Sequence, residues 1–307
     1  MLQKKTSILI AACIFIFALS LNAAQVTITI SRVSDDLPKH YKELKPFIDY
    51  LAAQLQTMGI KKGDILLARN NQELIQFVKD GKVDIVTETP FPAMVLMEKA
   101  GMKILLRRWK KGVPNYKSVI FTRKDSKINS LEDLKGKVIA FEDPGSTTGY
   151  FLPKVEIIKK GLQLVELKNY KEKPPLDKIG YCFAQSEVNI GHWVHKGFVE
   201  AGVLNDLEYQ SPEEVPANFI SDFKIIYETE EVPRNLILVR ADMEPKLQEK
   251  IKEIILNMGL TDEGRKIMWG MLKTSQFDEL PEKALEEMAK RFKEKYELLK
   301  AEIEKLP

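Results

Sequence analysis

Three consecutive hydroxyl side chains stand where a predicted strand gives way to a predicted helix. Ser146, Thr147 and Thr148 lie between Gly145 and Gly149. The free N–H groups of a first helical turn and the positive end of its dipole favour an anion, and glycines let a ligand approach the backbone closely. This segment is therefore a candidate anion-binding site. The alternative is an ordinary helix cap, for which one of these hydroxyls suffices.

Catalytic and metal-binding motifs are missing from the sequence. It has no nucleophile elbow, no Walker loop, no HExxH pair and no dinucleotide fingerprint. His192 and His195 have no third metal ligand at helical or hairpin spacing. Cys182 lies in an apolar strand-like run, which favours a buried, unreactive thiol; a soft-ligand contact in a cleft is the alternative. We expect a non-catalytic protein without metal or cofactor.

The N-terminal segment, residues 1–24, is typical of a secretory signal peptide, with two lysines, an uncharged apolar run and small residues at its end. Ser20 and Asn22 interrupt the run, so cleavage is favoured over retention as an anchor. Cys13 follows a segment that resembles a lipoprotein cleavage box, but the apolar run continues past it, and lipid anchoring stays the less favoured alternative. We expect a periplasmic protein.

The remaining chain is almost electrically neutral. Removing the signal segment leaves 45 basic and 44 acidic side chains, which argues against a nucleic-acid partner. A single cysteine remains, so the fold has no internal disulfide. About 280 residues are enough for two lobes with cores of ordinary size.

Strand and helix patterns alternate along the chain in a β-α-β-α-β order, which predicts an α/β fold with a doubly wound sheet. Strands are expected at 26–30, 64–68, 83–86, 118–123, 138–141, 164–166, 179–183, 223–227 and 236–240, and helices at 44–58, 72–79, 151–160, 188–195 and 282–305.

We expect two lobes with a hinge, and a ligand in the cleft between them. Lobe 1 would comprise residues 25–122 and 223–280, and lobe 2 residues 123–222. Residues 281–307 would form a C-terminal amphipathic helix whose apolar stripe packs on the body of the protein; docking to a partner is the alternative.

Several segments resemble, in the same order, the phosphate, phosphite and phosphonate substrate-binding proteins of ABC importers, often called PhnD-like. The similar segments are Gly81–Ile85, Ser130–Lys137, Asp143–Tyr150 with Pro153, Asn189–Gly202 and Val232–Arg240. The resemblance implies a type II periplasmic-binding-protein fold and a monomer that delivers a small oxyanion to an ABC permease. Reporting the oxyanion to a membrane sensor kinase stays open as the alternative.

The resemblance also implies ligand contacts. Ser146, Thr147 and Thr148 would donate hydrogen bonds to the ligand oxygens. In lobe 1 the loop after Val86 should face the cleft, where family members often have a tyrosine. This chain has Thr87, Glu88, Thr89 and Phe91 there instead. If Glu88 points inward it repels a dianion and favours a zwitterion or protonated ligand, whereas a solvated loop position is the alternative.

Two further contacts complete the expected site. Tyr41, in the loop after the first strand, is the second contact from lobe 1, and His40 beside it is expected at the surface. In lobe 2 the family's histidine that touches the oxyanion is missing, and Asn189 lies near its place. This departure again leaves the identity of the ligand open.

Overall fold

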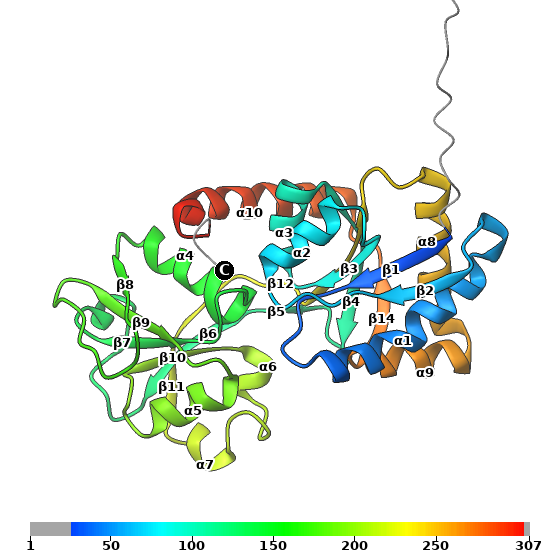
Figure 1. The fold of residues 1–307 in the computed structure, drawn as a ribbon. Coiled ribbons are helices and arrows are strands. Elements are labelled where there is room, and N and C mark those ends of the chain that lie inside the picture. The colour runs from blue at the N-terminus through cyan, green and yellow to red at the C-terminus, as the bar shows by residue number, and fades with distance from the viewer. Residues whose placement is uncertain (1–25, 304–307) are drawn as a thin grey trace, which may run out of the picture.

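Two six-stranded sheets, one in each lobe, form the framework of the protein (Figure 1). The structure is a computed structural model and describes residues 26–303. The predicted signal peptide, with Cys13, therefore lies outside the described residues. None of the helices within residues 26–303 is both long and apolar enough to cross a membrane.

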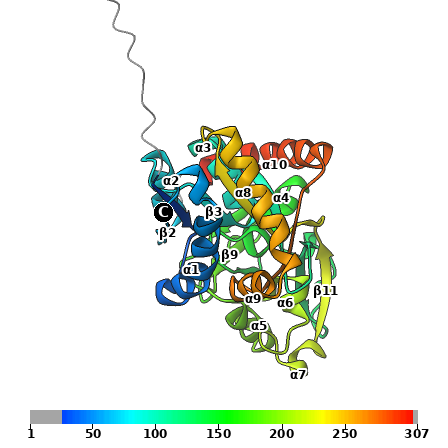
Figure 2. The ribbon, with the colours of Figure 1, turned by 90° about the vertical axis from the view of Figure 1, so that its right-hand side faces the viewer.

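The first lobe contains a sheet of order β14-β4-β13-β3-β1-β2. Its strands are β1 (Thr27–Ser31), β2 (Lys62–Ile65), β3 (Ile85–Glu88), β4 (Met102–Lys110), β13 (Asn235–Arg240) and β14 (Thr274–Asp278). Its helices are α1 (Leu37–Gln54), α2 (Asn71–Lys79), α3 (Pro90–Ala100), α8 (Pro245–Asn257) and α9 (Asp262–Gly270). Side chains of α1, α8 and α9 share one buried cluster with the sheet, and Figure 2 shows α8 in front of the strands. Residues of α2 and α3 belong to a second cluster.

The second lobe contains a sheet of order β11-β6-β10-β7-β9-β8. Its strands are β6 (Ser118–Arg123), β7 (Val138–Phe141), β8 (Leu164–Glu166), β9 (Ile179–Phe183), β10 (Ala201–Asn205) and β11 (Phe223–Glu228). Its helices are α4 (Leu152–Lys159), α5 (Glu187–His195), α6 (Asp206–Tyr209) and α7 (Ala217–Ile220), with a π-helical turn at Thr147–Phe151 before α4.

The crossings between the lobes differ from the predicted boundaries. Residues 118–123 and 223–227 were assigned to lobe 1, but they form β6 and β11, which pair with each other in the second sheet. The chain crosses instead at β5 (Asn115–Tyr116) and β12 (Val232–Pro233), which pair as a two-stranded ribbon. The predicted strands were correct, but their period-two pattern does not reveal which sheet they join.

The C-terminal helix α10 (Glu282–Ile303) lies against both lobes, from above α3 toward α4 (Figure 1). Its apolar stripe is buried, with Met288, Phe292, Tyr296 and Leu299 in the same cluster as residues of α3 and α4. Phe292 stacks on Phe151 with ring centroids 5.8 Å apart. The prediction that this stripe packs on the body of the protein is confirmed.

Candidate functional site

A cleft of about 500 Å³ lies between the lobes. In the first sheet β1 and β3 run parallel, while β13 and β4 alternate in direction. The ends of β1, β3 and β4 therefore meet the start of β13 at one edge. In the second sheet β7, β9 and β10 are parallel and also end at one edge. Residues just beyond these strand ends line the cleft, as is usual for ligand sites of α/β sheets.

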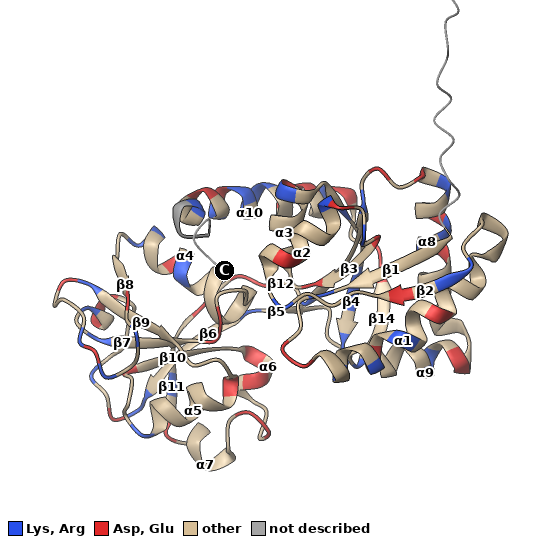
Figure 3. Ribbon diagram, in the orientation of Figure 1, with Lys and Arg blue, Asp and Glu red and all other residues tan. Residues whose placement is uncertain are grey.

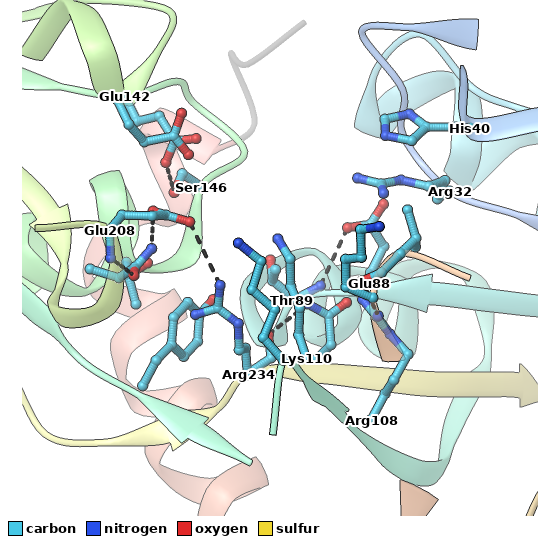
Figure 4. Close-up of a pocket in the computed structure, with 18 of the residues that line it drawn as sticks. Arg32, His40, Glu88, Thr89, Arg108, Lys110, Glu142, Ser146, Glu208 and Arg234 are labelled. Atoms are coloured by element: carbon cyan, nitrogen blue, oxygen red, sulfur yellow. Dashed lines mark hydrogen bonds and ion pairs between the residues drawn. The ribbon is translucent and has the colours of Figure 1, made fainter. Parts of the chain in front are cut away.

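The first wall of the cleft is rich in basic side chains. Arg108 and Lys110 project from β4, Arg32 follows β1, and Arg234 precedes β13 (Figure 4). Arg108 is only 2% exposed and Arg234 only 5%. Burial, together with repulsion from Arg32 and Arg234, lowers the pKa of Arg108 to about 9. Burial and the neighbouring arginines likewise lower the pKa of Lys110 to about 8.

The opposite wall, from the second lobe, is acidic. Glu142 follows β7, Glu187 begins α5 and Glu208 lies on α6, whose acidic residues are red in Figure 3. Burial raises the pKa of Glu208 to about 7, with a further contribution from Glu187, whereas Arg234 opposes the shift. Burial, Glu187 and Asp143 also hold the pKa of Glu142 well above its ordinary value. Within the described residues, every lysine and arginine of the lining comes from the first lobe or the crossing segments.

Two of the three hydroxyls at the predicted anion site, those of Ser146 and Thr147, already bond to the protein's own groups. Ser146 caps the helix by accepting a hydrogen bond from the Gly149 N–H (2.9 Å), so the capping alternative describes its role. Its hydroxyl also donates to Glu142 (2.7 Å). Gly149 is needed here because a Cβ would overlap the Glu142 carboxylate. Ser146 and Thr148 line the cleft together with Tyr116.

Thr147 connects the two lobes. Its hydroxyl donates to Thr89 Oγ1 (2.8 Å) and accepts from the Phe91 N–H (2.9 Å), at the start of α3 in the first lobe. Beside these bonds the rings of Phe91 and Phe151 stack with centroids 4.2 Å apart. Neither Thr147 nor Phe91 lines the cleft, so both act in holding the lobes together in this structure.

Glu88 points inward. It ends β3, is 7% exposed and lines the cleft with Thr89. Its carboxylate accepts hydrogen bonds from Val33 N–H (2.8 Å) and Thr89 N–H (3.3 Å), and burial raises its pKa. The alternative of a solvated loop glutamate is therefore wrong. Thr87 is also buried, in β3, but it does not line the cleft.

The expected contacts around α1 are placed differently from the prediction. The helix begins at Leu37, so Tyr41 lies in its first turns, 45% exposed and outside the cleft lining. His40 was expected at the surface, but it is 7% exposed and lines the cleft. Its Nδ1 lies 2.7 Å from the Ser34 hydroxyl, and burial lowers its pKa to about 4. The ring is therefore neutral at ordinary pH.

The remaining candidates in the second lobe lie away from the cleft. Asn189 is exposed, and its side chain donates to the Ala184 carbonyl (2.8 Å). Cys182 is buried in β9, which raises its thiol pKa to about 11, in agreement with an unreactive thiol. His195 stacks on Phe219, and His192 packs edge-on against the same ring. The structure thus uses both histidines in packing.

Sequence reasoning missed most of the charged lining. Arg32, Arg108, Lys110, Arg234 and Glu208 come from distant positions, and no local motif joins them. The five nevertheless share one feature, because each stands within a few residues of a strand end at the shared edges. The predicted strands included the one before Arg32 and the one after Arg234, but neither β4 nor β10. An inventory of charged residues at the ends of the predicted strands would therefore have found two of the five.

Two α/β lobes, joined by two crossing segments and enclosing a polar cleft, define the class of two-lobed solute-binding proteins. Residues 30–284 match the profile of the family described as "ABC transporter, phosphonate, periplasmic substrate-binding protein", and the chain belongs to this family. The resemblance noted from the sequence, with its type II fold, is thereby confirmed. The family is a substrate-binding component of transporters and not an enzyme.

Three relatives illustrate the assignment. The phosphonates-binding periplasmic protein of Escherichia coli K12 is 25% identical over 243 residues, covering 74% of this chain and 65% of that protein. The phosphate-import protein PhnD of Mycolicibacterium smegmatis is 29% identical over 141 residues, covering 44% and 43%. The chain thus spans less than two thirds of either curated relative. XAC2383 of Xanthomonas citri, solved with chloride, superposes with a TM-score of 0.84 at 28% identity, covering 89% of this chain and 99% of that one.

Proposed function

We propose that the protein captures a small phosphorus oxyanion, of the phosphonate, phosphite or phosphate class, in the periplasm and delivers it to an ABC permease. The observation that carries the proposal is the cleft between the lobes, where the first wall presents Arg32, Arg108, Lys110 and Arg234 to the cavity. Buried cations are costly unless an anion accompanies them. The same wall carries three acidic residues, Asp35, Glu43 and Glu88, against seven basic ones, so an excess of positive charge remains for an anionic ligand to balance.

The second wall narrows the class of ligand. Glu142, Glu187 and Glu208 repel a second negative group but attract an ammonium group. A cavity of about 500 Å³ falls within the roughly 300–1,000 Å³ range of small-molecule sites and leaves space beside an oxyanion. We therefore favour a zwitterion, such as an aminoalkylphosphonate, over bare phosphate. The inward position of Glu88 favours the same choice.

The relatives support an anionic ligand without identifying it. One is a phosphonates-binding protein and another a phosphate-import protein. XAC2383, the structural relative, has been solved with chloride and also with ATP. The four molecules named for these relatives are all anions, and three of them (phosphonate, phosphate and ATP) are phosphorus oxyanions. This supports an anionic ligand in this cleft.

Reporting to a sensor kinase is the alternative function. From the sequence it drew its support from α10 as a docking helix. In the structure the apolar stripe of α10 is buried against both lobes, which removes this support. Import therefore remains the favoured function.

The test is a thermal-shift and calorimetric titration of the mature protein. The ligands are phosphate, phosphite, methylphosphonate, 2-aminoethylphosphonate, ATP and sulfate, at constant ionic strength with chloride as the reference. Bound ligand raises the melting temperature, and we expect the largest rise with 2-aminoethylphosphonate. If no phosphorus oxyanion raises it, the proposed function is wrong. Uptake of the labelled ligand by cells with and without the gene then separates import, which fails without the gene, from sensing.

A further inference from the structure

The two most deeply buried arginines of the cleft have N–H groups without a partner. Arg108 Nε, and both Nε and Nη1 of Arg234, are buried and make no hydrogen bond within the described residues. Arg108 uses only Nη1, toward Thr274 Oγ1 (3.0 Å) and the Leu272 carbonyl (3.4 Å). A buried N–H without an acceptor is costly, so each of these groups requires a partner such as a ligand, an ion or a water molecule.

No carboxylate neutralises these groups in full. Arg108 has no acidic partner within 4 Å among the described residues, and the nearest to Arg234 is Glu208, with Oε1 3.7 Å from Nη2. Instead the cations lie near one another: Arg32 and Arg234 both lower the pKa of Arg108, and Arg234 lowers that of Lys110. Glu88 and Glu43 oppose the shift at Arg108 without cancelling it. The partly desolvated cluster is therefore incompletely neutralised, and its open N–H groups can receive an anion.

The backbone holds the two guanidinium groups in a fixed arrangement. Arg108 and Lys110 lie two residues apart on β4, so both face the same side of the sheet. Asn235 of β13 pairs with Arg108, which brings Arg234, the preceding residue, beside β4. The Arg234 guanidinium lies over the Tyr116 ring at 5.2 Å, and its backbone N–H donates to the Pro114 carbonyl (2.7 Å). The cluster thus sits where the chain leaves the first lobe.

We propose that Arg108 and Arg234, with Lys110 beside them, form the subsite that binds the oxyanion, instead of the Ser146–Thr148 segment. This inference rests on the proposed function and specifies where its ligand binds. Planar guanidinium groups offer paired N–H donors that match the oxygens of a tetrahedral phosphonate or phosphate. At the helix start, by contrast, Ser146 is committed to Gly149 and Glu142, and Thr147 to Thr89 and Phe91.

The location predicts an order of events. The anion first binds the first lobe and the crossing segment, and the second lobe then closes over the rest of the ligand with Glu142, Glu187 and Glu208. Because Arg234 stands on the crossing segment, the ligand contacts the part of the chain whose dihedral angles change as the lobes move. Binding there stabilises the closed arrangement.

The test is calorimetry with inorganic phosphate and methylphosphonate on the mature protein and its variants Arg108→Gln and Arg234→Gln. We expect each to weaken binding ~10- to 100-fold, since each removes charge-assisted hydrogen bonds. The melting temperature of each ligand-free variant shows whether it folds as the wild type does. Arg107→Gln is the matched control: it changes the neighbouring residue of β4, which binds Asp278 and Asn115 and lies outside the cleft lining. Its affinity should stay within ~2-fold.

Glutamine variants that fold and bind as the wild type does would overturn the proposal. So would loss of binding in Ser146→Ala/Thr148→Ala with the arginine variants unaffected, which would place the anion at the helix start. If either glutamine variant fails to fold, Arg108→Lys and Arg234→Lys decide by the same measurement, because lysine keeps the charge but not the paired donors. If wild-type protein binds no phosphorus oxyanion, the proposed function fails, and titrating sulfate and chloride into the same variants still tests the arginine subsite.

Discussion

Replacing Glu208 with glutamine should make the binding of a simple oxyanion tighter and less dependent on pH. Glu208 Oε1 lies 3.7 Å from Arg234 Nη2, so it competes with the ligand for this cation. An anion on the open side of Arg234 would lie ~7 Å from the carboxylate. At an effective dielectric constant of ~20–40 the repulsion is ~1–2 kcal/mol, or roughly 5- to 30-fold in affinity.

The tighter binding by Glu208→Gln should appear only at pH values at which Glu208 is ionised in the wild type. Its pKa in the folded protein is about 7, above the ordinary 4.5. The favourable contribution of this group to folding is therefore complete below 4.5 and is lost as pH rises through 7. The repulsion felt by a bound anion grows over the same range. The ratio of wild-type Kd to Glu208→Gln Kd for methylphosphonate should be near ~1 at pH 5.5 and about 5 or more at pH 8.5.

Isothermal titration calorimetry at four pH values between 5.5 and 8.5 measures this ratio, in which the ligand's own ionisation cancels. Glu172→Gln removes an exposed carboxylate of the same lobe outside the cleft lining, and its ratio should stay near one at every pH. With 2-aminoethylphosphonate the ratio should fall below one at high pH, because Glu208→Gln removes a carboxylate that attracts the ammonium group of the ligand. A ratio near one at every pH for methylphosphonate would show that Glu208 does not face the bound anion.

Three further predictions concern the packing around the site. Phe292→Ala should lower the free energy of unfolding by about 3–5 kcal/mol, because this 3%-exposed ring joins the aromatic stack between the lobes; denaturant titration measures it, with Leu298→Ala, half exposed on the same helix, as a nearly neutral control. Gly149→Ala should lower the free energy of unfolding by about 1–3 kcal/mol, because the added Cβ would overlap the Glu142 carboxylate. Gly259→Ala is the control, since its Cβ would meet open space. Equal melting temperatures for the two variants would contradict the overlap. The raised pKa of Cys182 should make it react with a thiol reagent at pH 8 at least ~100-fold more slowly in native than in unfolded mature protein, and equal rates would refute its burial.

The elements of the fold could be predicted from the sequence more fully than their assembly. Strands β6, β7, β8 and β9 have the predicted bounds, because β-branched and apolar runs between turns identify buried strands locally. Their partners depend on register and on contacts across the chain, so β6 and β11 were assigned to the wrong lobe. The residues of a strand do not by themselves determine which neighbouring strand it pairs with.

The site shows the same division between local and non-local information. The Ser146–Thr148 segment was conspicuous because its three hydroxyls are adjacent, and Ser146 does cap the helix as local chemistry predicts. The Glu142 carboxylate that accepts the Ser146 hydroxyl stands four residues earlier, and it was overlooked because acidic residues after a strand are common. Arg108 and Arg234 are 126 positions apart in the numbering and meet only through the β4–β13 pairing.

The opposite charges of the two walls follow from two independent facts. Sheet topology decides which residues reach the cleft, since those beyond the ends of β1, β3 and β4, and of β7, β9 and β10, converge on it. Individual residue identity then decides the charge. Basic side chains outnumber acidic ones such as Glu88 at the first set of strand ends, whereas the charged residues of the lining beyond the second set are all glutamates. The sheet topology belongs to the fold and is compatible with many different ligands. The charges in the cleft, by contrast, have to complement one particular ligand. A ligand with a single negative charge would satisfy the first wall and leave the second unpaired, so closure is strongest for a molecule that carries both signs.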